Sequence, residues 1–303
     1  MRMPAFWQVI AGSGHCVVHP VCCAPDCVDS LTNPAEGRPM TDRQKYLFDV
    51  SGYLVLDDIL TSDQCKLLTD ALHTVRDTPE DDLPTGVRCT AISDGEDSIG
   101  DLTSIGPLFT DLIDLAPVVD ILTEIISPRL RLEVAYARIR KKGYEGLHLH
   151  GGARDEIDPN FTYTSKNGRI FAGHTVVSFN LTDVTEEEGG FVCIPGSHNN
   201  QFPTPHDLTD FSDGTYDASV LRSVPCKVGS VVIFTEALAH GALPWHSDDD
   251  RVNLFYKYNH AGMKWRHFWP TKEALDQMTP SQRMFYTEVA ADGRKEPVLH
   301  PGR

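Results

Sequence analysis

Two histidine segments carry the residues best suited to metal chemistry. His148 and His150 stand two positions apart just before Gly151-Gly152, and His240 follows about ninety residues later. A mononuclear non-haem iron centre binds imidazoles and usually one carboxylate on one face of the metal, and it leaves the other positions open. These residues therefore predict a site in which His150 and His240 hold iron(II), while the open positions take a chelating co-substrate and oxygen.

Arg251 has the position expected of a carboxylate-binding cation beside such a centre. It follows His240 by 11 residues, with the polar segment 247–250 between them. A strand can thus leave the metal, turn, and return with Arg251 pointing inward. The planar guanidinium matches a carboxylate in bidentate fashion, which suits the distal carboxylate of 2-oxoglutarate. The alternative, a surface ion pair with the acids at 248–250, contributes little to stability.

The elements that must position these residues change type along the chain. Helices are predicted at 41–50, capped by Thr41, at 62–76 and at 116–126, with a loop at 77–106 between the last two. Short strands follow from Leu130 onward, at 169–171, 175–181, 190–194, 220–224, 230–234 and 252–258. Helices at 272–278 and 280–289 close the chain. This order predicts an α+β, mostly β fold, a double-stranded β-helix (jelly roll, cupin-like) with flanking helices.

The composition excludes several classes of protein. The 303 residues are 41% hydrophobic, which is enough for a core, and their formal net charge is −16. Such an acidic chain repels phosphate backbones, so we expect no nucleic-acid partner. No apolar run reaches the roughly 18 residues of a spanning helix, so no membrane span is expected. A small-molecule substrate and O2 are the expected partners, and the sequence leaves the oligomeric state open.

The first 39 residues differ from the rest of the chain. They contain four of the eight cysteines but little charge or periodicity. We interpret residues 1–39 as a weakly ordered extension, in preference to a zinc module, which needs a second well-spaced ligand pair. Residues 40–303 then form the jelly-roll domain. The other four cysteines are scattered, which favours reduced thiols and a cytoplasmic location.

Several motifs together give the chain a family resemblance. Phe48–Leu56 reads Phe-Asp-Val-Ser-Gly-Tyr-Leu-Val-Leu, Glu188–His198 contains Pro-Gly-Ser-His, and Gly229–Phe234 precedes His240 and Arg251. Over about residues 43–260 the chain resembles the phytanoyl-CoA dioxygenase (PhyH) family of iron(II)- and 2-oxoglutarate-dependent oxygenases. The resemblance implies that His150 and His240 bind Fe(II), that Arg251 binds 2-oxoglutarate, and that the enzyme hydroxylates a small molecule.

The chain departs from the family at one metal ligand. The family pattern His-x-Asp would place an acid at position 152, where this chain has glycine. In one interpretation Asp155 or Glu156 supplies the third ligand. In a second, His148 does so, since residues i and i+2 share one face of a strand. In a third, the position is vacant, as in the halogenases of this superfamily, where a halide replaces the carboxylate, or catalysis is lost.

Other residues have weaker assignments. Tyr136 and Ser178 lie on predicted barrel strands, where either can donate a hydrogen bond to 2-oxoglutarate. His198 is expected to pack within its turn together with Ser197, and His174 is expected to be exposed. Two alternatives to the oxygenase stay open: a catalytically silent jelly-roll binding protein, and a zinc or other metal cupin without a 2-oxoglutarate step.

Overall fold

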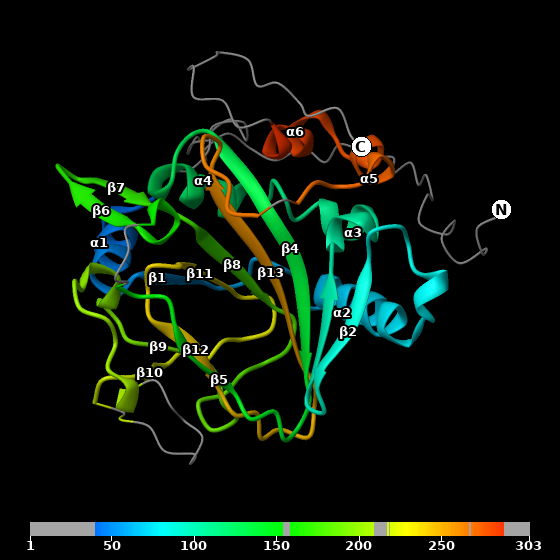
Figure 1. Cartoon of the computed structure of the whole chain (residues 1–303), viewed down its shortest axis with the longest axis horizontal. Coiled ribbons are helices and arrows are strands. Elements are labelled where there is room, and N and C mark those ends of the chain that lie inside the picture. The colour runs from blue at the N-terminus through cyan, green and yellow to red at the C-terminus, as the bar shows by residue number, and fades with distance from the viewer. Residues whose placement is uncertain (1–39, 154–157, 209–216, 218, 267, 288–303) are drawn as a thin grey trace, which may run out of the picture. The chain divides into compact units, whose positions relative to one another are not determined.

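A computed structural model describes residues 40–153, 158–208, 217, 219–266 and 268–287. The predicted extension 1–39 lies outside these residues. Figure 1 shows strands crossing the middle of the domain, with helices beside them. In the described part of the chain, no helix combines the length and apolar character needed to cross a membrane.

The larger of two main sheets has seven strands, all paired antiparallel, in the order β1-β11-β8-β13-β4-β3-β2. Their bounds are β1 Tyr53–Leu56, β2 Arg88–Ser93, β3 Glu96–Gly100, β4 Leu130–Arg140, β8 Thr175–Asn180, β11 Val231–Thr235 and β13 Arg251–His260. The long strands β4 and β13 lie next to each other and form the middle of this sheet (Figure 1).

The smaller sheet has four strands in the order β10-β9-β12-β5. Its strands are β5 Leu147–His150, β9 Gly190–Cys193, β10 Arg222–Ser223 and β12 His240–Leu243, and a separate hairpin pairs β6 Tyr163–Lys166 with β7 Arg169–Ala172. Buried side chains of both sheets meet in one cluster, which contains Val176 and Phe234 of the large sheet and Phe191 and Cys193 of the small one. Two antiparallel sheets packed in this way are the predicted jelly roll.

Within the described residues, six helices accompany the sheets. They are α1 Asp42–Ser51, α2 Ser62–Asp77, α3 Pro107–Thr110, α4 Ala116–Ile125, α5 Lys272–Gln277 and α6 Pro280–Arg283, with 3-10 turns at Glu80–Asp82, Leu102–Ser104, Pro159–Phe161, Ser197–Asn199, His206–Leu208 and Met284–Tyr286. Thr41 caps α1 in a capping box with Gln44, as predicted. The final helix was predicted to reach residue 289, but it ends at Arg283 and continues as a 3-10 turn.

Alternation along the strands separates an inner from an outer face. On β13, Leu254, Tyr256 and Tyr258 belong to the main hydrophobic core, together with apolar residues of α2, α3 and α4. The hydroxyls of Tyr256 and Tyr258 donate to the carbonyl oxygens of Phe109 and Ile113. The helices therefore cover the outer face of the large sheet, and the intervening residues of β13 face the small sheet.

The prediction of a loop over 77–106 is wrong for about half of that segment. Residues 88–100 form the β2–β3 hairpin, and β3 extends the large sheet by pairing with β4. Its strands are polar, with Glu96, Asp97 and Ser98 in sequence, so alternation of apolar residues gave no signal. The buried carboxylate of Glu96 is instead matched by the Arg140 guanidinium, Nε to Oε1 at 2.8 Å.

Candidate metal centre

His150 and His240 face each other across the small sheet. His150 ends β5 and His240 begins β12, and the two are register partners in the antiparallel pair. Directly opposite residues project their side chains to the same side of a sheet. The ring centroids are 4.2 Å apart. Two imidazoles from distant parts of the chain thus come together, as the sequence predicted.

Backbone carbonyl groups orient both rings. Nδ1 of His240 lies 2.7 Å from the Leu238 carbonyl oxygen, and Nδ1 of His150 lies 3.2 Å from that of His148. A carbonyl oxygen only accepts, so each Nδ1 carries the proton and each Nε2 keeps its lone pair. This is the usual orientation of a histidine that ligates metal through Nε2. Burial lowers the pKa of His240 to about 3, so its ring is neutral near neutral pH.

A carboxylate completes the group from an unexpected position. Glu236 lies in the turn between β11 and β12, is 2% exposed, and places a ligand atom with those of His150 and His240, all within 4.8 Å of one another. The sequence analysis missed it. The available signal was a single acid in Val231–Leu243, a run that is mostly apolar apart from Thr235 and His240, because an acid buried there needs a partner.

The partner of Glu236 in this structure is Lys257. Its Nζ lies 2.5 Å from Oε1 of Glu236, from the inner face of β13. Burial by itself would raise the pKa of Glu236, but the neighbouring cationic groups, Lys257 first among them, together outweigh it and lower that pKa to about 2. The carboxylate is therefore ionised at neutral pH, as a metal ligand must be.

The residues that the sequence offered as the third ligand are placed differently. His148 is exposed and does not belong to the His150–Glu236–His240 group. Asp155 and Glu156 lie outside the described residues. Gly152 has φ +74°, and a Cβ built on it would lie 3.4 Å from Cβ of Ala239, so the space beside it accepts a side chain that this chain lacks.

Arg251 is buried inside the barrel at 3% exposure. Its Nε and Nη1 have no hydrogen-bond partner among the described residues. Burial lowers the pKa of the guanidinium to about 9, which still leaves it charged near neutral pH. The alternative, a surface pair with the acids at 248–250, is not formed, since Asp250 lies near Arg76 and Asp248 pairs with Lys142. A buried cation with unpaired donors is costly unless an anion binds there.

Tyr136 and Ser178 lie in one row across the inner face of the large sheet. Both are register partners of Phe255, one from β4 and the other from β8. The Tyr136 and Phe255 rings stack with centroids 5.1 Å apart. Along β13 this row falls between Arg251 and Lys257. In the strand register, Tyr136 and Ser178, whose hydroxyls were predicted to contact the co-substrate, thus lie between Arg251 and Lys257, the partner of Glu236.

Residues 153–253 match the family model "Phytanoyl-CoA dioxygenase (PhyH)". Over that segment this chain is similar to the phytanoyl-CoA dioxygenase family. The match includes the Pro-Gly-Ser-His motif, His240 and Arg251, which carried the resemblance in the sequence. The family recognition made from those motifs is therefore confirmed.

Relatives and solved structures agree with this assignment. The ectoine dioxygenase of Sphingopyxis alaskensis is 23% identical over 243 residues, covering 73% of this chain and 76% of the relative. The structure of HygX from Streptomyces hygroscopicus with nickel, 2-oxoglutarate and hygromycin B matches with a TM-score of 0.65 at 23% identity, over 75% of this chain and 90% of HygX. EctD from S. alaskensis, with 2-oxoglutarate and 5-hydroxyectoine, gives 0.55 at 20% identity over 77% and 80%. At these identities the likeness to the solved structures establishes the jelly-roll fold.

The side chains inside the barrel fit iron and 2-oxoglutarate by the chemistry of their donor atoms. Two imidazoles and one carboxylate are the donor set that non-haem iron(II) prefers. The unpaired donors of Arg251 fit the distal carboxylate of 2-oxoglutarate. His174, predicted to be exposed, is instead fully buried, and its carbonyl oxygen accepts from the Glu236 amide at 2.9 Å. It thus fixes the backbone of the carboxylate residue.

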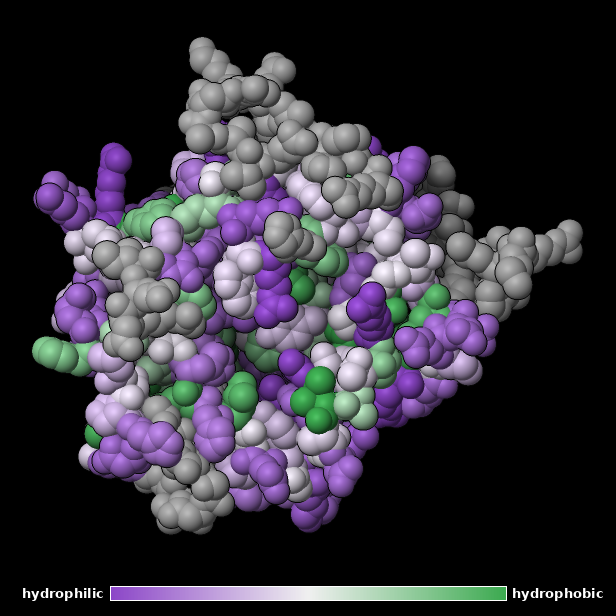
Figure 2. Space-filling view, in the orientation of Figure 1, coloured by the Kyte–Doolittle hydropathy of each residue, from purple (hydrophilic) through white to green (hydrophobic). Residues whose placement is uncertain are grey.

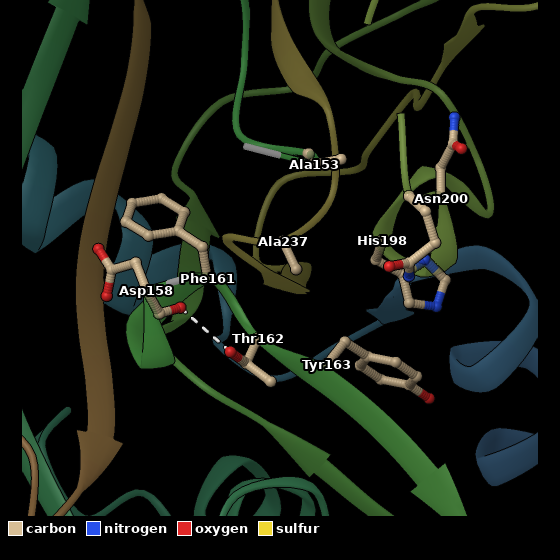
Figure 3. A pocket seen from close by; sticks show the side chains of 10 residues that line it. Ala153, Asp158, Phe161, Thr162, Tyr163, His198, Asn200 and Ala237 are labelled. Carbon is tan, nitrogen blue, oxygen red and sulfur yellow. Dashed lines mark hydrogen bonds between the residues drawn. The ribbon is translucent and has the colours of Figure 1, made fainter. Parts of the chain in front are cut away.

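A cavity of about 260 Å³ opens beside the centre. Figure 3 shows the side chains around it, which come from the β5 end, the β6 hairpin, the Pro-Gly-Ser-His turn and the turn that carries Glu236. Its lining residues are Gly152, Ala153, Asp158, Phe161, Thr162, Tyr163, His198, Asn200, Gln201 and Ala237. In the space-filling view, hydrophilic residues predominate over this face of the domain (Figure 2). The cavity is the candidate substrate site.

Proposed function

We propose that this chain is an iron(II)- and 2-oxoglutarate-dependent oxygenase that hydroxylates a small molecule. The observation that carries the proposal is the barrel interior: two metal-competent imidazoles meet an ionised carboxylate, and a buried guanidinium with unpaired donors lies in the same interior. In the balanced reaction, R–H, O2 and 2-oxoglutarate give R–OH, succinate and CO2. One oxygen atom enters the product and the other enters succinate.

Each residue has a role in this proposal. His150 and His240 hold the iron through Nε2, and Arg251 binds the distal carboxylate of 2-oxoglutarate, with Tyr136 and Ser178 donating from the adjacent row. When bound, the iron supplies oxygen activation and the oxidising power that cleaves an unactivated C–H bond. Apolar side chains of both sheets, among them Phe191 and Phe234, pack against His240 and shield that ring from water, while His150 is exposed.

The cavity lining indicates the class of substrate. Among the described residues, its polar side chains are hydroxyls, amides, an imidazole and one carboxylate, that of Asp158, with no lysine or arginine in that set. Burial lowers the pKa of His198, which keeps that ring neutral near neutral pH. A polar molecule that is neutral or cationic is therefore favoured over a phosphorylated one. The similar structures that contain hygromycin B and 5-hydroxyectoine support a small-molecule substrate.

We further propose a cytoplasmic location. The described cysteines Cys65, Cys89, Cys193 and Cys226 are all free. Burial raises the pKa of Cys193 to about 12 and that of Cys226 to about 11, so both are protonated, unreactive thiols. Free thiols in a chain with an ample core are typical of a reducing compartment.

Succinate release tests the function. The purified protein with Fe(II), ascorbate and 2-oxoglutarate should form succinate slowly without substrate and faster with a suitable polar amine or polyol. Arg251→Gln should raise the KM for 2-oxoglutarate at least tenfold, because it removes a charge-assisted bidentate contact. Arg88→Gln, an exposed residue of β2, is the matched control and should leave that KM unchanged. Metal binding without any succinate would support the silent binding protein instead.

A further inference from the structure

We propose that Glu236 is the carboxylate ligand of the metal centre, supplied from the β11–β12 turn in place of the acid missing at position 152. The inference rests on the proposed function and goes beyond it, since it moves one ligand to a different element of the fold. It also replaces the three possibilities that the sequence left open. The centre then consists of His150, Glu236 and His240, with Lys257 as the positioning residue of the carboxylate.

Geometry supports this assignment first. Glu236 and His240 are four residues apart, on either side of the turn that carries the chain from the large sheet to the small sheet. Residues 235, 237 and 238 are buried, and the Leu238 amide donates to the Thr235 carbonyl at 3.0 Å, so the turn is tightly fixed. The Glu236 amide is held by His174. A carboxylate on so constrained a backbone meets the two rings without a large conformational change.

The pairing of the two carboxylate oxygens supports it second. The Glu236 carboxylate is 2% exposed, and Lys257 contacts one of its oxygens, Oε1, at 2.5 Å. The other oxygen, Oε2, has no such contact with Lys257 and is the one that a metal at His150 and His240 would take. Lys257 can therefore keep its ion pair while Glu236 ligates, as hydrogen-bonded partners of ligating carboxylates do.

The position of Lys257 is itself fixed. Its Nζ lies over the Tyr136 ring, 5.8 Å from the centroid, and over that of Trp265 at 5.4 Å. Gly152 stands where the family pattern has its acid, and without a side chain it supplies no ligand atom. The only acidic side chain that the described residues bring to the two imidazoles is thus Glu236.

The experiment measures metal binding without turnover. Co(II) is titrated into the metal-free full-length chain, with calorimetry for affinity and the visible absorption of Co(II) for its ligand set. Wild type should bind one Co(II), and Glu236→Gln should weaken binding at least tenfold and change the spectrum. Glu187→Gln, an exposed acid outside the group, is the matched control and should match wild type.

Glu236→Gln leaves Lys257 without its anion and so endangers folding. The double variant E236Q/K257M removes both charges together, which avoids an unpaired buried cation, and it should show the same loss of Co(II) binding. Co(II) affinity and spectrum unchanged in either folded variant would overturn the role of Glu236, while the proposed oxygenase would stand on its histidines. Failure of the wild type to bind Co(II) would instead overturn the proposed function itself.

Discussion

At the residue scale, the centre depends on how each polar atom is paired. Nδ1 of both histidines is bonded to a carbonyl group, Oε1 of Glu236 is bonded to Lys257, and Nε and Nη1 of Arg251 have no partner in the described chain. The paired atoms hold the ligands in place, and the remaining lone pairs and donors are those that iron and 2-oxoglutarate would use. The spacing of His150, His240 and Arg251, together with the family resemblance, was enough to single them out, and the structure brings the two histidines together and buries the arginine. Glu236 could not, since its contact with the histidines depends on the turn between the two sheets.

Restoring the acid at position 152 should compensate for loss of Glu236. We expect E236Q/G152D to recover most of the Co(II) affinity lost in Glu236→Gln, since a side chain at 152 meets only ordinary contacts, 3.4 Å to Ala239 and 3.5 Å to Thr204. Aspartate is among the residues that adopt positive φ most readily, although leaving glycine costs about 1–2 kcal/mol of folding stability.

The matched control for this rescue is E236Q/G152N. Asparagine has the same shape and imposes similar backbone strain, but it lacks the charge, so its Co(II) affinity should stay at the level of Glu236→Gln. Equal affinities of the aspartate and asparagine variants, measured by calorimetry, would contradict the prediction.

At the element scale, the Pro-Gly-Ser-His turn joins three parts of the fold. Nε2–H of His198 donates to the Asp49 carbonyl of α1 at 3.1 Å, while Ser197 Oγ accepts from the Ala239 amide at 2.8 Å, beside His240. The His198 ring also stands edge-on to Tyr163 of β6, with centroids 4.4 Å apart. The sequence predicted that His198 packs in this turn together with Ser197; both side chains are buried, and their contacts reach beyond the turn. Their partners in α1 and β6 are distant in sequence and required the structure.

This turn should make the fold sensitive to acid. Burial lowers the pKa of His198 below its ordinary value of about 6.5, so the unfolded chain binds a proton that the folded chain does not. The free energy of unfolding therefore falls as pH drops below about 6.5, by at most about 1.4 kcal/mol per pH unit from this residue. His198→Gln, whose amide can still donate to Asp49, should flatten the dependence in urea unfolding between pH 7.5 and 5.

The control for acid sensitivity is His206→Gln, which removes an exposed histidine. It should retain the wild-type dependence of unfolding free energy on pH. If His198→Gln keeps the full wild-type slope as well, His198 is not a source of the acid sensitivity.

At the scale of the whole domain, the candidate centre lies where the two sheets are coupled. His150 and His240 belong to the small sheet, Glu236 lies in the turn that leaves β11 of the large sheet, and Lys257 belongs to β13. The jelly roll itself could be predicted, because strand alternation and turns are local signals. The β2–β3 hairpin could not, because its polar residues are stabilised by the neighbouring strand β4 and not by an apolar pattern of their own.

Metal binding should therefore stabilise the domain as a unit. At a free Ni(II) concentration 100 times the dissociation constant, mass action adds about 2.7 kcal/mol to the free energy of unfolding. For a domain of this size the melting temperature rises by roughly 2–4 °C for each kcal/mol.

Amide exchange should slow most in β5, an edge strand that pairs only with β12 in its sheet and whose last residue is His150. The His150→Ala/His240→Ala double variant should show neither effect, since it lacks both nitrogen ligands. Stabilisation of that variant equal to wild type would place the bound nickel elsewhere, whereas protection confined to β5 and β12 would mean that the metal does not couple the two sheets.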